Sequence, residues 1–496
     1  MTGKNETRTV GPLPDANEST PRLPALFTRV VWLAWVASLL VVGARLRAGE
    51  GWELAGVVSV DGLTVVMWAV VTFLSGVVHS YSRRYMAGSE TITRFFTRLF
   101  GFTLAVMVLV AADHVVLFGV AWLAMGLVMA DLVGTARGWP QARAAASLAR
   151  RYFLASSALL GVSFLLLWSA TDATTVSGIA EGVDAASETT VLLAATALLL
   201  AAMIQSALVP FHTWLLSSMT APTPASALMH AGFVNAGGLL FVRFAPVVGF
   251  DSRFMLVVVV VGATSALLGK LLKSVQTDIK TRLGCSTTGQ MGFMILQAGL
   301  GYFGAALTHL VLHGFYKAYL FLGSGRQVEQ TSPSPSAPET SGFGVVGATV
   351  TVLTAAAGGA VFAILTGKGT TLDSGLLLTG LVALTTLHAT QTVVRRTGVR
   401  PGLRYGVVVV VFLPSIVVYA GAYTAITGLL GGLPLVTAPA DLTAVHIAVA
   451  AAFGVAYLAV ELEVYKRSHR LYVGLLNATQ PPSDSLLTSS EEYNEY

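Results

Sequence analysis

The stretch ALTHLVLHGFYKAYLFLG, residues 306–323, is apolar enough to lie in a lipid bilayer, yet it contains His309, His313 and Lys317. Four residues of α-helix turn by about 400°, so each step of four drifts by only about 40° around the axis. The three ionisable side chains therefore share one face of a helix and rise by about 12 Å along it. A charge at the centre of a bilayer costs at least about 2.5–3.5 kcal/mol, and such residues normally face a bundle interior or water. We expect this face to point inward.

The composition defines the class of protein. Of 496 residues, 54% are hydrophobic and only 11% are charged, whereas a soluble domain has about 25% charged residues. Apolar runs longer than about 18 residues recur, which indicates a polytopic helical membrane protein. The predicted fold class is all-α, with about 14 transmembrane helices at residues 27–43, 61–80, 98–112, 115–134, 152–169, 190–209, 226–248, 254–272, 285–302, 304–323, 343–366, 374–394, 405–429 and 442–462.

Positive charge is distributed unevenly among the loops between these spans. Of the 30 Lys and Arg residues, 24 fall in the tails and alternate loops, four in the opposite loops and two inside spans. Cytoplasmic loops are enriched in Lys and Arg, so the pattern predicts a cell-membrane protein with both termini in the cytoplasm. The formal net charge of +5 arises in these loops and does not indicate a nucleic-acid partner.

Three polar segments complete the predicted organisation. Residues 1–26 are expected to be a disordered cytoplasmic tail, because the N-terminal stretch is polar, contains Pro and lacks the apolar core of a cleavable signal peptide. Residues 27–463 form the transmembrane bundle, which a Ser/Pro-rich cytoplasmic linker at 325–342 divides. Residues 464–496 are expected to be a cytoplasmic tail whose basic start acts as a lipid-surface anchor.

The sequence offers no energy source or cofactor site of its own. Cys285 is the single cysteine, which excludes a disulfide within the chain and thiolate clusters for zinc or iron–sulfur. Neither a P-loop motif nor a dinucleotide-binding fingerprint is present. We expect no cofactor in this chain, which must then use an ion gradient or a partner.

The His309, His313 and Lys317 stripe has the chemistry of a proton wire. Histidine donates and accepts a proton near neutral pH, and burial or nearby cations lower the pKa of a lysine. The alternative is that the three groups only form hydrogen bonds between helices. Their regular spacing favours conduction.

A second group of candidates lies at residues 205–244. Pro210 lacks an N–H and is expected to break or kink the span at 190–209, and Pro222 and Pro224 keep the connection irregular. Non-helical backbone at membrane depth occurs only beside protein or a water-filled cavity. His230 follows as a candidate proton carrier, with a packing role as the alternative, whereas Arg243 near the span end either snorkels or contacts a partner.

Each ionisable residue at a span end has two alternative roles. Asp278 and Lys280 either feed protons to the stripe or form a surface pair. Asp113, His114 and Asp131 are either solvated or functional.

Three lysines remain. Lys270 and Lys273 are interpreted as a cytoplasmic charge cluster, and Lys368, between two glycines, marks a span that is broken rather than finished.

Three long motifs resemble the proton-translocating, antiporter-like subunits of respiratory complex I and of Mrp-type cation/proton antiporters. They are LVPFHTWLLSSMTAPTPASALMHAGFVNAGG, SVQTDIKTRLGCSTTGQMGFMIL and ALTHLVLHGFYKAYLFLGSG, in family order within about residues 60–370. The resemblance implies two inverted five-helix repeats, each with a broken helix and a chain of Lys, His and acidic groups. By position, the proton-path residues are His230, Lys280, His309, His313 and Lys317, and Lys368 corresponds more weakly to the broken-helix lysine of the second repeat.

The first repeat departs from the family pattern. The family glutamate after Trp122 is Leu123 here, the broken-helix lysine falls on Gln205, and the acid of the next helix is missing near Leu160. The resemblance therefore implies one intact repeat rather than two.

The stretches ALMHAGFVNAGGLLFVRFAP and HRLYVGLLNA resemble the DabB family, the membrane subunits of DAB-type inorganic carbon accumulation systems. This implies a chain that passes protons or sodium ions to drive one-way CO2 hydration in DabA, a large partner that holds zinc and resembles a β-carbonic anhydrase. Two alternatives remain: a proton-pumping subunit of NADH-quinone oxidoreductase or of an Mrp antiporter, and a non-conducting scaffold for a soluble partner.

Overall fold

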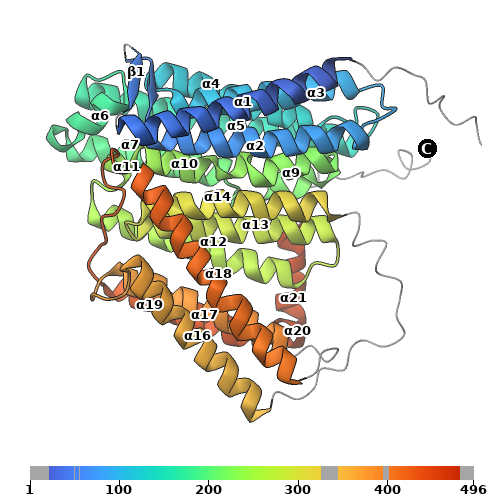
Figure 1. Ribbon diagram of the computed structural model, residues 1–496, viewed down its shortest axis with the longest axis vertical. Coiled ribbons are helices and arrows are strands. Elements are labelled where there is room, and N and C mark those ends of the chain that lie inside the picture. Colours follow the sequence, from blue (N-terminus) through green and yellow to red (C-terminus); the bar gives the residue numbers. More distant parts are fainter. Residues whose placement is uncertain (1–21, 50, 55, 325–343, 395–400, 481–496) are drawn as a thin grey trace, which may run out of the picture.

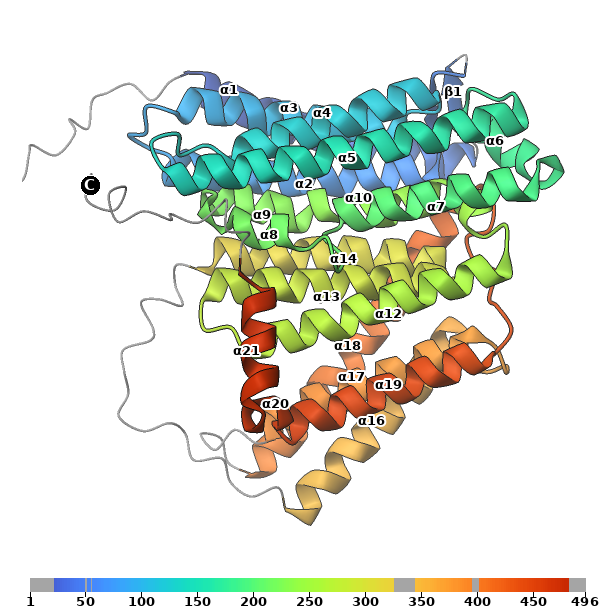
Figure 2. The same cartoon turned by 180° about the vertical axis from the view of Figure 1, so that it is seen from behind.

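The computed structural model describes residues 22–480 apart from 50, 55, 325–343 and 395–400. The long helices form a bundle with α1–α5 along one side, α12–α14 in the middle and α16, α17 and α19 along the other side, and α18 crosses it obliquely from α16 past α14 to α2 (Figures 1 and 2). The helices are α1 (Arg22–Ala48), α2 (Gly62–Tyr85), α3 (Ile92–Ala111), α4 (Val115–Val133), α5 (Pro140–Thr171), α6 (Val176–Gly182), α7 (Glu188–Gln205), α8 (Thr213–Ser217), α9 (Thr223–Ala231), α10 (Ala236–Arg243), α11 (Ala245–Val248), α12 (Ser252–Ser274), α13 (Ile279–Gly299), α14 (Phe303–Leu322), α16 (Val345–Thr366), α17 (Ser374–Val394), α18 (Pro401–Leu429), α19 (Ala444–Glu461), α20 (Val464–Arg467) and α21 (His469–Ala478).

The prediction of a polytopic helical membrane protein is confirmed. Among the described residues, 12 helices are long and apolar enough to cross a membrane. The central helices α13 and α14 are not among them, because side chains such as Gln290, His309 and Lys317 lower their mean hydropathy. A protein environment has to compensate for that polarity, and both helices lie in the middle of the bundle (Figure 1).

The all-α prediction is wrong at one place. Strand β1 (Trp52–Leu54) pairs with β2 (Val58–Val60) in an antiparallel hairpin between α1 and α2. The hairpin is linked by an isolated bridge between Val58 and Ala112 to the turn from α3 to α4. Its three-residue strands are too short to leave a clear alternating pattern in the sequence.

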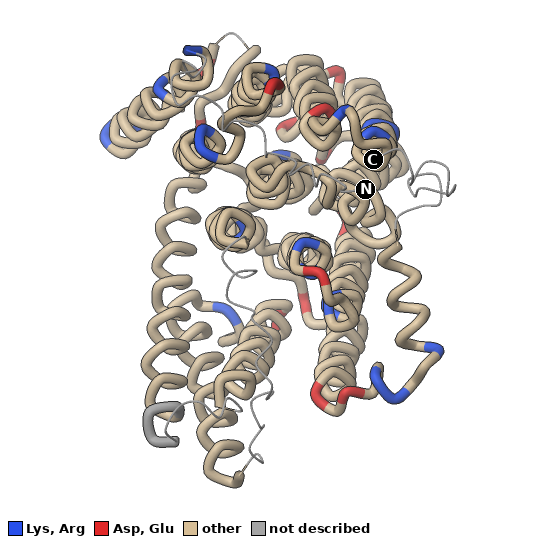
Figure 3. The backbone as a smooth tube through the Cα atoms, turned by 90° about the vertical axis from the view of Figure 1, so that its right-hand side faces the viewer, with Lys and Arg blue, Asp and Glu red and all other residues tan. Residues whose placement is uncertain are grey.

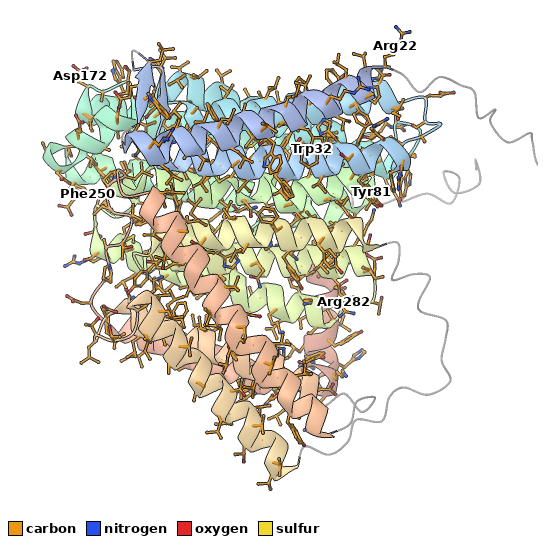
Figure 4. All side chains as sticks on the ribbon, in the orientation of Figure 1. Arg22, Trp32, Tyr81, Asp172, Phe250 and Arg282 are labelled. Atoms are coloured by element: carbon orange, nitrogen blue, oxygen red, sulfur yellow. The ribbon has the colours of Figure 1, made fainter. Side chains whose placement is uncertain are left out.

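One end of the bundle is basic. Arg22 and Arg282 lie at this end, whereas Asp172 and Phe250 lie at the opposite end (Figure 4). Figure 3 looks onto the basic end, where Lys and Arg recur at the helix ends. The long helices therefore present their charged termini on the side that the loop pattern assigns to the cytoplasm.

The two predicted tails are partly helical. Helix α1 begins at Arg22, inside the stretch 1–26 that the sequence assigns to a disordered tail. Helix α21 runs across the ends of other helices (Figure 2), where Leu475 is buried with Leu272 and Cys285. This part of the tail therefore packs on protein. The predicted linker at 325–342 and the remaining tail residues lie outside the described residues.

Helices α12 and α13 make a very close contact through glycines. A Cβ at Gly292 would lie 2.4 Å from the backbone nitrogen of Ala266, and one at Gly262 would lie 2.4 Å from that of Leu296. Small residues are what allow membrane helices to approach this closely. The contact fixes α13, which bears the polar groups described below.

We expect Gly292→Ala to destabilise the protein, because a methyl group cannot fit unless the α12 and α13 backbones move apart. The matched control is Gly161→Ala on α5, where the added Cβ meets nothing within 4 Å. Alanine is preferred over glycine in a helix by about 1 kcal/mol, so this variant should be neutral or more stable. Melting temperatures in detergent test the pair, and equal behaviour would contradict the close packing.

Candidate functional site

The ionisable stripe of α14 faces the bundle interior, as predicted. His313 is 5% exposed and Lys317 is fully buried, and the rings of His309 and His313 are 5.9 Å apart between centroids. Phe315 and Tyr319, which point away from the stripe, are exposed. The ionisable face of the helix therefore packs against α9 and α13, whereas its aromatic face points out of the bundle.

Helices α9, α13 and α14 meet at a hydrogen-bonded junction. The Lys317 amine donates to the Leu283 carbonyl at 2.9 Å, and the Thr287 hydroxyl donates to the same carbonyl at 2.9 Å. Thr287 Oγ1 also lies 3.0 Å from Nδ1 of His230. The Leu283 carbonyl oxygen is thus shared by donors from α13 and α14. Lys317 and His230 are therefore connected through α13, and the structure brings together two of the predicted carriers.

The junction suggests a tautomer for His230. A hydroxyl has one proton, and that of Thr287 is directed to Leu283, so Thr287 accepts at its contact with His230. This assigns the proton to Nδ1 and leaves the lone pair on Nε2. The fully buried ring stacks on Phe321, with centroids 4.2 Å apart and planes 14° apart.

Several buried polar atoms around the junction have no protein partner. Among the described residues, Nε2 of His230 and both ring nitrogens of His313 lack a hydrogen bond within the chain. Buried polar groups in native proteins are usually bonded to protein or to ordered water. Unpartnered imidazole nitrogens at this depth are the groups that a chain of water molecules would bridge.

The broken-helix region follows the prolines. Helix α7 ends at Gln205, the chain passes through Pro210 without helical structure, and Pro222 precedes α9, with Pro224 in its first turn. Gln205 is fully buried, and neither its amide oxygen nor its nitrogen has a partner among the described residues. The break thus leaves a neutral, buried polar side chain at the position where the resemblance implies a lysine.

Neither residue of the predicted Asp278 and Lys280 pair bonds to the other. The Asp278 carboxylate caps α13 by accepting from the Thr281 N–H at 2.7 Å. The Lys280 amine donates to the Ala221 carbonyl at 3.2 Å, in the break before α9. Lys280 is close enough to His230 to interact with it electrostatically, so of the two it is the one positioned toward the junction.

The acidic and histidine residues at the other span ends have local partners. Asp113 accepts from the N–H and hydroxyl of Ser177 at 3.0 and 2.8 Å. His114 caps α4. Asp131 forms ion pairs with Arg98 and Arg150. These bonds stabilise turns and helix ends, and a role for Asp113 in proton transfer stays a prediction.

Arg243 forms a contact within the chain. It makes an ion pair with Asp61 and donates to the Val110 carbonyl at 2.6 Å. The guanidinium therefore joins α10 to the start of α2 and the end of α3. This contact explains the position of Arg243 without snorkelling or a partner chain, the two explanations that the sequence offered.

Lys368 lies in a turn between two separate spans, so the prediction of a broken span is wrong. Helix α16 ends at Thr366 and α17 begins at Ser374, and Gly367 has φ +69°, which glycine adopts without strain. The Lys368 amine is 3.2 Å from the centroid of the Tyr423 ring and near those of Tyr302 and Phe362. It has no hydrogen-bond partner among the described residues, and burial lowers the pKa of Lys368 to about 7.

We expect the stability of the native protein to rise with pH between about 7 and 10, because the unfolded chain binds a proton at Lys368 that the folded chain has lost. Lys368→Met reduces this rise, whereas Lys466→Met at an exposed ion pair leaves it in place. Melting temperatures from pH 6 to 10 test this. The same slope in native protein and Lys368→Met would show that attraction between the ammonium and the rings outweighs burial.

The sequence did not predict the positions and contacts of several other polar residues. His79 is fully buried on α2, with Nδ1 2.8 Å from the Ser75 carbonyl. Lys270 is not only part of a surface cluster, because its amine lies 2.8 Å from His388. A lone histidine without a regular spacing gives no signal in one sequence. No group of three His, Cys, Asp or Glu suited to a metal occurs among the residues that the structure describes.

A family model described as "NADH:quinone oxidoreductase/Mrp antiporter, TM" matches residues 112–390, more than half of the chain. The chain belongs to this NADH:quinone oxidoreductase/Mrp antiporter family. A second model, the "NADH-Ubiquinone oxidoreductase (complex I), chain 5 N-terminus", matches residues 51–96. Both family matches agree with the resemblance found in the motifs.

The curated relatives of this chain have names that indicate different functions. The chain is 40% identical over 324 residues to the "Probable inorganic carbon transporter subunit DabB1" of Halothiobacillus neapolitanus, covering 63% of this chain and 58% of that protein. It is 38% identical over 272 residues to "NADH-quinone oxidoreductase subunit L" of Mycobacterium tuberculosis, covering 54% of this chain and 42% of that one. The matches thus span about half the length of these curated relatives.

The fold is similar to that of a chain in a solved Mrp complex. A chain in the "Structure of Mrp complex from Dietzia sp. DQ12-45-1b" matches with a TM-score of 0.56 and 21% identity, covering 94% of this chain and 50% of that one. The likeness supports the antiporter-like fold.

Proposed function

We propose that this chain is the proton-conducting membrane subunit of an inorganic carbon uptake complex. The observation that carries conduction is the junction, in which the buried Lys317 and His230 are linked through Thr287 and Leu283. The similarity to DabB1 supports inorganic carbon uptake as the process that this chain serves. Ionisable groups inside a membrane protein are costly and mark ion pathways.

The proposed path runs along α14. Protons move among His309, His313 and Lys317 and reach His230 across the junction. Both His230 and Lys317 interact electrostatically with His313, so a proton that enters the group changes the energy of each neighbouring site. Na⁺ as the coupling ion would need oxygen ligands, whereas the groups here are mainly nitrogens that gain and lose protons, which supports H⁺.

We propose that the first repeat does not conduct. The positions where the resemblance expects a glutamate and a lysine hold the neutral Leu123 and Gln205, and nearby Trp122 donates to the Ser156 hydroxyl at 3.2 Å while Ser156 donates to the Ala201 carbonyl. Leu160 is fully buried in the apolar core. We therefore propose a single proton path, in the half of the bundle that contains α13 and α14.

The proposed partner is a DabA-like zinc subunit that hydrates CO2 to bicarbonate. Proton flow through this chain would make that hydration one-way, and the zinc would be held by the partner. We further propose fourteen spans arranged with two inverted repeats and with both termini in the cytoplasm, in keeping with the basic end (Figure 3). A neighbouring gene for a large Cys- and His-rich zinc protein supports this assignment.

The second candidate function is proton pumping in an NADH-quinone oxidoreductase or Mrp complex. The similarity to subunit L favours it. A full set of NADH:quinone oxidoreductase genes beside this one would favour that function over carbon uptake.

We expect Lys317→Met to abolish proton flux and growth. The chain is co-expressed with its zinc partner in a carbonic-anhydrase-deficient host grown in air, and flux is measured with a pH dye in proteoliposomes. Loss of a positioned proton carrier typically costs about 100-fold or more. Lys466→Met, at an exposed ion pair, is the control, and equal melting temperatures exclude misfolding.

Growth and flux that survive Lys317→Met would reject conduction through the stripe and favour the scaffold hypothesis. Uptake insensitive to an uncoupler would reject proton coupling.

We expect Thr287→Val to reduce flux without abolishing it, because valine keeps the shape of threonine but cannot join His230 to the Leu283 carbonyl. A hydrogen bond contributes about 1 kcal/mol, which corresponds to roughly a fivefold change in rate. Thr287→Ser restores the hydroxyl and should restore most of the flux. Equal fluxes for valine and serine would show that the link is structural only.

A further inference from the structure

A cavity of about 270 Å³ lies between α12, α13, α17 and α19. It is partly open, and its lining includes Lys270 and Lys273 of α12, Gln290 and Phe293 of α13 and His388 of α17. At about 30 Å³ per water molecule, it has room for several waters. The proposed path on α14 does not include this cavity.

Three ionisable side chains form a continuous chain beside it. The Lys270 amine is 2.8 Å from Nε2 of His388, and Nδ1 of His388 is 2.9 Å from Oε1 of Glu461. They come from three different helices, α12, α17 and α19. The Glu461 and His388 side chains are 14% and 31% exposed, so the chain is partly shielded from the surroundings.

Further polar groups hold Glu461 in place. The Gln391 side chain contacts the Tyr457 hydroxyl at 2.7 Å, and its amide nitrogen, assigned from this network, donates to both Glu461 oxygens at 3.2 Å. Gln391 and Tyr457 are therefore positioning residues. Charged and titratable groups around His388 are Lys270 and Lys273 from α12 and Glu461 and Tyr457 from α19.

The cavity extends from these groups toward the ionisable stripe of α14. Lys270 and Glu461 lie close to the ends of α12 and α19 at the basic end of the bundle, where α17 also ends. Phe293 lies about two-thirds of the way along α13 from that end. Its ring is 5.5 Å from the ring of His309 between centroids. One aromatic ring thus lies between the cavity and the first member of the stripe.

We propose that this cavity is the entry vestibule of the proton path and that Glu461, His388 and Lys270 pass protons between the basic end and the waters that reach His309. The proposal deepens the proposed function and rests on it. It assigns a role to three residues that lie outside the resemblance motifs, and it makes Phe293 the barrier between vestibule and stripe.

The transfer balances at each atom. In the resting arrangement, Nδ1–H of His388 donates to the Glu461 carboxylate, and Nε2 accepts from the Lys270 ammonium. In one step, Lys270 gives a proton to Nε2 while the Nδ1 proton passes to Glu461, so Lys270 becomes neutral, Glu461 becomes protonated and His388 changes tautomer. For inward transfer, Glu461 takes its proton from the basic end, the reverse step returns a proton to Lys270, and Lys270 hands it to the vestibule water. A turn of the His388 ring then restores the tautomer that accepts the next proton from Glu461.

The first test measures proton flux in proteoliposomes that contain the complex. His388→Gln and Lys270→Gln, which remove the relay from two different helices, should each lower flux by about tenfold or more and flatten its dependence on pH near neutrality. The control is His469→Gln, an exposed histidine on α21 at the same end. Lys317→Met is measured beside them.

The outcomes separate the two proposals. Native flux in Lys317→Met overturns the proposed function. Flux lost in Lys317→Met but unchanged in amount and pH profile in both His388→Gln and Lys270→Gln overturns the relay and leaves the function standing.

A second test does not depend on activity. Gln290 is exposed although α13 is central, and the single native cysteine, Cys285, is buried. Gln290→Cys should react with a membrane-impermeant thiol reagent in inverted vesicles and not in intact cells, with the native chain as background. No reaction in inverted vesicles overturns the vestibule.

Discussion

The hydrogen bond between the Lys317 amine and the Leu283 carbonyl, 2.9 Å long, joins the ionisable face of α14 to α13. An amine in a fully buried site loses its hydration, and only a well-placed acceptor reduces that cost. The same carbonyl accepts from Thr287, which contacts His230. One backbone oxygen therefore positions the two carriers on which the proposed conduction depends.

That position depends in turn on glycine packing. Leu283 and Thr287 sit on α13, which approaches α12 so closely that Gly262 and Gly292 leave no room for a Cβ. Helices in a membrane gain little from hydrophobic burial against each other, so close backbone approach and hydrogen bonds hold them. The rigid pair of α12 and α13 thus has the junction on one side and the vestibule, with Lys270, on the other.

The two halves of the bundle differ in polarity. In the first half, Gln205 occupies the broken-helix position with an unpartnered amide, and Leu160 lies in an apolar core. A neutral amide can bind water but does not take up a proton near neutral pH. Neutral residues at the expected lysine and acid positions of one half, beside the ionisable stripe of the other, are consistent with a chain that uses a single path.

The sequence by itself determined the membrane class, the inward stripe of α14 and the break near Pro210, because hydropathy, a spacing of four and missing N–H groups are local properties. It did not show the β1–β2 hairpin, the turn at Lys368 or the ion pair of Arg243 with Asp61. Only the tertiary structure decided that Lys280 bonds to Ala221 and that Lys270, His388 and Glu461 meet. These residues are far apart in the chain, and a hydrogen bond depends on the positions of both partners, which helix packing alone sets.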